Sequence, residues 1–163
     1  MPHRTSKVFH VVLGTSLAAV ATALVSQYMF DMPPCAWCVL QRMIFLVIAV
    51  VSGLAIWLRH PLVRIGLGAT IVLLAASGIA SALYQHFVAA ADMTSCRLSL
   101  AEKIIVGTLH LDTLLPSVFG IRVGCSAGAT AMLGVPYEFW SLGAFGFLMA
   151  VLIWSAIQGL RLR

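Results

Sequence analysis

Four long apolar stretches constrain the fold of this chain more than any other feature, and they cover residues 8–30, 39–58, 65–85 and 139–159. A helix needs about 20 mostly apolar residues to cross the hydrocarbon core of a bilayer. The composition agrees, because only 9% of the 163 residues are charged, against about 25% in ordinary soluble domains. We therefore predict an all-α membrane protein whose single domain, residues 1–163, is a four-transmembrane-helix bundle.

The charged residues predict the orientation of this bundle. Six basic residues flank one side and the five acidic residues lie on the other: Arg4, Lys7, Arg59, Arg64, Arg161 and Arg163 against Asp31, Asp92, Glu102, Asp112 and Glu138. Since Lys and Arg collect in cytoplasmic loops, we expect cytoplasmic termini and external, periplasmic loops at 31–38 and 92–138. The basic residues are scattered singly, which argues against nucleic acid as a partner despite the net charge of +5.

The first apolar stretch has a second interpretation. Basic residues precede it and Ala-Thr-Ala follows at 21–23, so it has some features of a cleavable signal peptide. Its apolar run is longer than the usual signal core, and we interpret it as a retained helix. Cys35 would be external in either case.

The chain has four cysteines, Cys35, Cys38, Cys96 and Cys125, and all of them fall on the predicted outer side. The Cys-x-x-Cys pair closes a very small ring, so it removes little entropy from the unfolded chain and is a poor structural brace. A helix that begins near Cys38 favours the thiolate, which is the reactive form of the side chain. The spacing therefore predicts that Cys35 and Cys38 are redox-active.

Two other uses of the cysteines have to be weighed. Two structural disulfides would suit external loops, because disulfides persist in the periplasm and no odd thiol is left over. A zinc site is disfavoured, since structural zinc sites pair their cysteines closely whereas Cys96 and Cys125 are widely separated. We expect no metal.

Arg42 follows Cys38 by four residues, so on a helix their Cβ atoms share a face about 5 to 6 Å apart. A permanent cation there can stabilise a thiolate or the developing oxyanion of a carbonyl acceptor. The alternative is an arginine that snorkels to the outer interface. Its position on the outer side, against the general distribution of basic residues, favours a functional role.

The long external loop is too apolar to lie free in water. Ser-Leu-Ala-Glu at 99–102 has the form of a capping box, and leucines and isoleucines follow at helical spacing. We predict an amphipathic, interfacial helix on the outer membrane surface, with packing against the bundle as the alternative. Cysteines in this loop can reach a soluble partner, while cysteines at the membrane edge can reach a lipid-soluble two-electron acceptor such as a quinone.

Together these features resemble the DsbB family, the inner-membrane disulfide bond formation proteins. The resemblance covers essentially the whole chain and depends on PCAWC followed by Arg42, on YQHF late in the third stretch, and on LLPSVF before Cys125. It implies a thiol:quinone oxidoreductase of the bacterial inner membrane. Such an enzyme reoxidises a DsbA-like periplasmic thiol oxidase and passes the electrons to a quinone in the membrane lipid.

The resemblance also implies roles for single residues. Reduced DsbA would attack the Cys96–Cys125 disulfide at Cys96, and Cys125 would then exchange with the Cys35–Cys38 pair through a transient Cys35–Cys125 bridge. Cys38, as a thiolate beside Arg42, would pass electrons to ubiquinone or menaquinone, and His86 would hydrogen-bond a quinone oxygen. The family often has glutamate where this chain has Gln41, so Arg42 would lack a carboxylate partner and the thiolate would be more stabilised.

Two further readings of the whole chain belong to other classes. One is a small non-catalytic membrane protein with structural disulfides. The other is a vitamin K epoxide reductase-like enzyme, which also joins a Cys-x-x-Cys pair to a quinone in a four-helix core. The position of Cys35 and Cys38 ahead of the second helix argues against the second reading. Tyr84, Trp37, Tyr137 and Trp140 fit an aromatic belt at the outer interface.

Overall fold

The computed structural model describes residues 2–58, 60–89, 100–108, 110–124, 131–132 and 134–161. Its long helices are α1 (Pro2–Met29), α2 (Ala36–Trp57), α3 (Pro61–Tyr84) and α7 (Tyr137–Arg161). Its short elements are the π-helical turn η1 (Gln85–Ala89), α4 (Leu100–Glu102), the π-helical turn η2 (Lys103–Thr108), α5 (Leu111–Leu114), α6 (Pro116–Phe119), β1 (Ala131–Met132) and β2 (Val135–Pro136).

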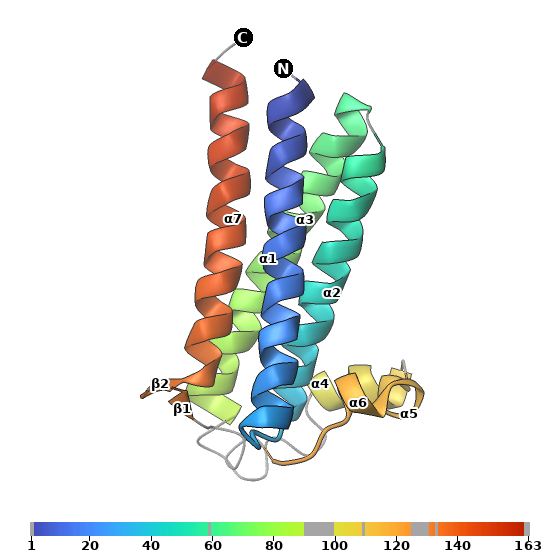
Figure 1. Cartoon of the computed structure of the whole chain (residues 1–163), viewed down its shortest axis with the longest axis vertical. Helices are drawn as coiled ribbons and strands as arrows, with labels where there is room; N and C mark the ends of the chain where they lie inside the picture. The colour runs from blue at the N-terminus through green and yellow to red at the C-terminus, as the bar shows by residue number, and fades with distance from the viewer. Residues whose placement is uncertain are drawn as a thin grey trace.

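The four long helices form the predicted bundle. Each is long and apolar enough to cross a membrane, and α1 packs against both α2 and α7 while α3 packs against α2 and α7. Both chain termini lie at one end of the bundle (Figure 1). The opposite end, which we call the cysteine end, carries Cys35 and the short elements. The predicted fold class, an all-α four-helix membrane bundle, is confirmed.

The helices begin a few residues earlier than the apolar stretches predict, because a helix begins at its cap while the apolar run marks only its lipid-exposed part. Helix α2 begins after Cys35, whose sulfur accepts a hydrogen bond from the Cys38 N–H and so caps the helix. Helix α3 begins with Pro61, a residue whose fixed φ suits the first helical position. The Arg64 Nε–H donates to the Ala55 carbonyl over 3.0 Å, which closes the short turn between these two helices.

The short elements lie at the cysteine end (Figure 1). The segment from α4 to α6 projects sideways next to the first turns of α2. The β1–β2 hairpin precedes α7. Helix α4 covers Leu100–Glu102, and Ser99, the expected cap, lies outside the described residues, so the capping box stays a prediction. The position of the segment that begins with α4 on the membrane surface stays a prediction.

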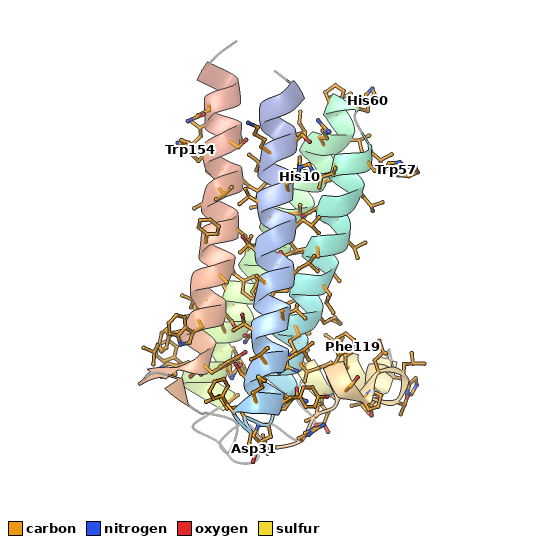
Figure 2. All side chains as sticks on the ribbon, in the orientation of Figure 1. His10, Asp31, Trp57, His60, Phe119 and Trp154 are labelled. Carbon is orange, nitrogen blue, oxygen red and sulfur yellow. The ribbon has the colours of Figure 1, made fainter. Side chains whose placement is uncertain are left out.

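Side chains at the two ends of the bundle differ. Figure 2 shows Trp57, His60 and Trp154 near the end with the termini, whereas Asp31 and Phe119 lie at the cysteine end. Both tryptophans are exposed, as expected for indole rings at a lipid–water boundary. The predicted aromatic belt is wrong for Trp37, which is 7% exposed and stacks against Tyr84 with ring centroids 4.8 Å apart.

Aromatic rings from α2 and α7 pack against a glycine of α3 inside the bundle. Phe45 and Phe145 stack with ring centroids 3.9 Å apart and planes at 2°. A Cβ atom on Gly78 would lie 2.5 to 2.6 Å from three atoms of the Phe145 ring. Gly78 is therefore required by packing, because any side chain would displace this ring.

We expect Gly78→Ala to destabilise the bundle by about 1 to 3 kcal/mol, because the added methyl group overpacks the space that Phe145 occupies. Thermal unfolding of the detergent-solubilised protein measures this effect. Gly66→Ala in the same helix is the matched control, since a Cβ atom there meets nothing within 4 Å. Equal unfolding temperatures for the two variants would contradict the packing argument.

Candidate functional site

The cysteine pair is buried at the start of α2. Pro33 and Pro34 precede it, Cys35 caps the helix, and Cys38 lies in the first turn. The two sulfurs are unbridged and 3.0 Å apart, close enough for one thiol to donate a hydrogen bond to the other. The Cys38 N–H also points at the Cys35 sulfur, 3.4 Å away. The pair thus has the contact that dithiol–disulfide chemistry requires.

The environment distinguishes the two sulfurs. Cys35 is fully buried, and its pKa is raised well above the usual value because its thiol hydrogen-bonds to the Cys38 sulfur and because burial disfavours the charged form. In the reduced pair, therefore, Cys35 keeps its proton and donates it in the hydrogen bond to Cys38.

Arg42 lies one turn after Cys38 and is buried, with 4% of its surface exposed. Its Nη1 donates to the Gln27 Oε1 over 2.6 Å and to the Val118 carbonyl over 3.2 Å, and its Nη2 donates to the Ala23 carbonyl over 3.1 Å. Its Nε–H has no partner among the described residues. The snorkelling alternative is wrong, since the guanidinium points into the bundle and joins α1, α2 and α6.

Gln41 hydrogen-bonds to Gln85 in η1 and not to Arg42. Its Nε2 donates to the Gln85 Oε1 over 2.9 Å, and the Gln85 Nε2 donates to the Cys38 sulfur over 3.4 Å. Both glutamines are 2% exposed. Among the described residues, the side chain that accepts from Arg42 is the uncharged Gln27 on α1, and its other acceptors are backbone carbonyls.

A cavity of about 320 Å³ lies beside the cysteine pair. Its walls come from α1, α2 and α7, and they are mostly apolar with a few polar groups: Ala19, Thr22, Ala23, Cys38, Gln41, Arg42, Phe45, Tyr137, Trp140, Ser141 and Ala144. Trp140 is 49% exposed, so the cavity reaches the outer surface of the bundle, which would face lipid. This volume lies within the range of about 300 to 1,000 Å³ that is typical of small-molecule sites.

His86 lies near the cysteine pair but is not among the residues that line this cavity. Its Nδ1 is 2.8 Å from the Glu138 Oε1, which joins η1 to the start of α7. The Glu138 side chain is buried, and its Oε2 has no partner within the part of the chain that the structure describes. The predicted contact between His86 and a quinone therefore stays a prediction.

The other two predicted cysteines, Cys96 and Cys125, lie outside the described residues. The chain ahead of Cys125 is nevertheless well anchored. The Arg122 N–H donates to the Pro34 carbonyl over 3.1 Å, and the Tyr28 hydroxyl donates to the Ser117 carbonyl over 2.7 Å. Residues 116–122 are thus held against the segment that leads into Cys35. Among the described residues, no group of three or more His, Cys, Asp or Glu side chains could hold a metal.

Sequence reasoning missed Gln27, Gln85 and Glu138 as parts of the site, and it assigned Tyr137 and Trp140 to an aromatic belt without recognising that they line the cavity. One signal was available for the glutamines. Polar side chains inside apolar spans are costly and usually mark function, and Gln27, Gln41 and Gln85 all interrupt such spans. No signal pointed to Glu138, because its partner His86 is 52 positions away.

Comparison with known proteins decides the family. A family model described as Disulfide bond formation protein DsbB matches residues 4–155. The chain belongs to the DsbB family. DsbB proteins form disulfide bonds, and the buried Cys35–Cys38 pair has the geometry for that chemistry.

Individual DsbB relatives match over most of their length. Disulfide bond formation protein B 1 of Pseudomonas syringae pv. syringae is 32% identical over 155 residues, covering 94% of this chain and 90% of the relative. Its namesake in Pseudomonas savastanoi pv. phaseolicola is 34% identical over 158 residues, with coverage of 94% and 90%. Disulfide bond formation protein B of Cupriavidus metallidurans is 33% identical over 135 residues, with coverage of 82% and 81%. Family membership makes this chain a multi-pass, disulfide-forming membrane protein.

The raised pKa of Cys35 predicts how its alkylation depends on pH. In the fully reduced protein, we expect the pH of half-maximal alkylation rate at Cys35 to lie above about 8.5, the midpoint for an ordinary cysteine. The midpoint moves upward because the folded protein disfavours loss of the Cys35 proton. Limited alkylation with a small reagent, resolved by peptide mass spectrometry, gives the profile. A midpoint at or below pH about 8.5 would show that the pKa of Cys35 is not raised.

Proposed function

We propose that this protein is a thiol:quinone oxidoreductase that reoxidises a DsbA-like dithiol protein. The observation that carries the proposal is the position of Cys38 and Arg42 in the wall of one apolar cavity that reaches the outer surface of the bundle. A redox-active sulfur, a buried cation and a lipid-accessible space suit an electron acceptor that is dissolved in the membrane. Ubiquinone and menaquinone are the two candidates.

We place the protein in the bacterial inner membrane with both termini in the cytoplasm. The end with the termini carries Lys7 and Arg64, whereas the cysteine end carries Asp31 and Glu138. This distribution follows the tendency of basic residues to stay cytoplasmic. The cysteine end is then periplasmic, where a soluble dithiol partner is available.

Electrons enter, in this proposal, at the Cys96–Cys125 disulfide. The reduced partner attacks Cys96, which breaks that bond and forms a mixed disulfide. The second thiol of the partner resolves this mixed disulfide, so the partner leaves oxidised and Cys96 and Cys125 are both reduced. Cys125 then attacks Cys35, which forms a Cys35–Cys125 bridge and releases Cys38 as the thiolate. Cys96 attacks Cys125 in turn, which restores the Cys96–Cys125 disulfide and leaves Cys35 and Cys38 both reduced. The anchored loop supports the attack on Cys35, because Cys125 follows Arg122 by three positions and three residues span at most about 10 Å, while Arg122 is bonded to Pro34.

Electrons leave through Cys38. When bound, a quinone supplies an acceptor for two electrons and two protons, which equals what the Cys35–Cys38 dithiol releases on closing its disulfide. The guanidinium of Arg42 borders the cavity, and its positive charge would stabilise negative charge that develops on a carbonyl oxygen there. Phe45 and Trp140 offer apolar surface for a ring, and Cys35 retains the proton until its sulfur attacks Cys38.

Anaerobic mixing of the purified protein with reduced DsbA and ubiquinone tests this function. Quinone absorbance and DsbA thiols are followed together, and we expect one quinone to be reduced for every two thiols oxidised. Cys38→Ser should abolish quinone reduction, because it removes the sulfur that lines the cavity. If the quinone stays oxidised while the thiols persist, the structural-disulfide interpretation becomes the better one.

Partial filling of the cavity should weaken quinone binding without affecting thiol exchange. Ala144 lines the cavity from α7, so we expect Ala144→Leu to raise the KM for quinone about tenfold, which corresponds to about 1.4 kcal/mol. The rate at which reduced DsbA exchanges with the cysteines should be unchanged. Ala150→Leu is the matched control, since Ala150 is exposed on the same helix and outside the cavity. A KM that rises equally in both variants would place the quinone elsewhere.

A further inference from the structure

The side chain of Gln85 provides a hydrogen-bond donor to Cys38 at a buried position. Gln85 is the first residue of η1, the π-helical turn that ends α3, and turns of this kind are frequent at functional sites. Its amide nitrogen is 3.4 Å from the Cys38 sulfur. Gln85 is 2% exposed and Cys38 is 7% exposed, so little water is available to take the place of this donor.

The amide of Gln85 is oriented by a second amide. A glutamine side chain presents an oxygen that only accepts and a nitrogen that only donates. Because Gln41 donates to the Gln85 oxygen over 2.9 Å, the Gln85 nitrogen is turned toward Cys38. Helix α2 thus supplies both the Cys38 sulfur and, three residues later, Gln41, which orients the Gln85 amide of η1 toward that sulfur.

The donor reaches only one of the two sulfurs. Cys35 interacts with the Cys38 sulfur and with the backbone N–H groups of Trp37 and Cys38, whereas the hydrogen bonds of the two glutamines run to each other and to Cys38. Cys38 is also the cysteine that lines the cavity. A buried thiolate is costly unless donors surround it, so an amide aimed at Cys38 alone favours the negative charge on that sulfur.

We propose that Gln85 is a catalytic residue that stabilises the Cys38 thiolate by direct hydrogen bonding, and that Gln41 is the positioning residue that fixes the direction of the Gln85 amide. The reduced pair then carries its charge on the sulfur that faces the cavity and its proton on Cys35. The importance of this placement for turnover rests on the proposed function, in which Cys38 delivers electrons to the acceptor.

The other groups that face Cys38 have to be kept constant in any test. The titratable or charged ones are Cys35 ahead of α2, Arg42 on α2 and Tyr137 on α7. From α1, the residues that share the cavity wall with Cys38 are all uncharged: Ala19, Thr22 and Ala23. Substitutions at Gln41 and Gln85 leave all of these side chains in place.

The test is the pH profile of Cys38 alkylation in the reduced, full-length protein, without quinone or DsbA. Peptide mass spectrometry separates Cys38 from the other cysteines. We expect Gln85→Leu to raise the pH of half-maximal rate at Cys38 by about one unit, a tenfold change in ionisation, because a hydrogen bond to a charged group is lost. Gln41→Leu should cause a smaller shift in the same direction, since the Gln85 amide then turns freely.

Gln41→Glu gives the sharpest prediction. A carboxylate at this position only accepts, so it would bond the Gln85 nitrogen and turn the Gln85 oxygen toward Cys38. The upward shift should then exceed that in Gln85→Leu, because the new negative charge near Cys38 adds to the loss of the donor. If Gln85→Leu does not fold, Gln85→Asn decides the question, because it keeps the site polar and adds no charge while its shorter side chain withdraws the amide from Cys38.

Ser81→Ala is the matched control. Ser81 is buried one turn before Gln85, and its hydroxyl donates to the Gly78 carbonyl over 2.8 Å without contacting Cys38. It should lose some thermal stability and leave the Cys38 profile unchanged. An unmoved profile in Gln85→Leu and Gln41→Glu would overturn the proposal, as would equal shifts in Ser81→Ala.

The outcome separates this proposal from the proposed function. If the Cys38 profile shifts as expected while quinone is not reduced, the amide pair is supported and the acceptor is wrong. If quinone is reduced and the profile does not move, the oxidoreductase function stands and the role of Gln85 is wrong.

Discussion

The burial of a guanidinium group among neutral acceptors is the interaction on which the reactive end of this protein depends. Arg42 carries its charge inside an apolar bundle, where polar groups must find partners within the protein. It finds them on α1 at Gln27 and Ala23 and in α6 at Val118. Arg42 therefore ties α2 to α1 and α6. The cysteine pair, which lies one turn away on α2, is held in the same framework.

This framework gives two chemically identical side chains different surroundings. Cys35 is enclosed and hydrogen-bonded to Cys38, and it directly follows Pro34, to which Arg122 is bonded. Cys38 borders a cavity and accepts a hydrogen bond from Gln85 of η1. In the function that we propose, this difference sets the order of electron transfer, with Cys35 receiving electrons from the loop cysteine and Cys38 passing them to an acceptor in the membrane.

Much of the fold and part of the site could be predicted from the sequence. The long apolar runs and the spacing of Cys35, Cys38 and Arg42 are local patterns, so they predicted the helices and the shared helix face. The partners of these residues could not be predicted, because Gln27, Gln85 and Val118 are separated from them by 15, 47 and 76 positions. Periodicity describes one helix at a time, whereas the rotation of each helix against its neighbours decides which polar groups meet.

The cavity beside Cys38 reaches the side of the bundle, since Thr22 on α1 and Trp140 on α7 line it and are both exposed. A hydrophobic acceptor that enters there, as we propose, never has to leave the lipid phase. Its encounters with the protein then follow diffusion in two dimensions, and what governs its supply is its mole fraction in the bilayer instead of its concentration in water. The composition of the host membrane thereby becomes a kinetic parameter of the enzyme.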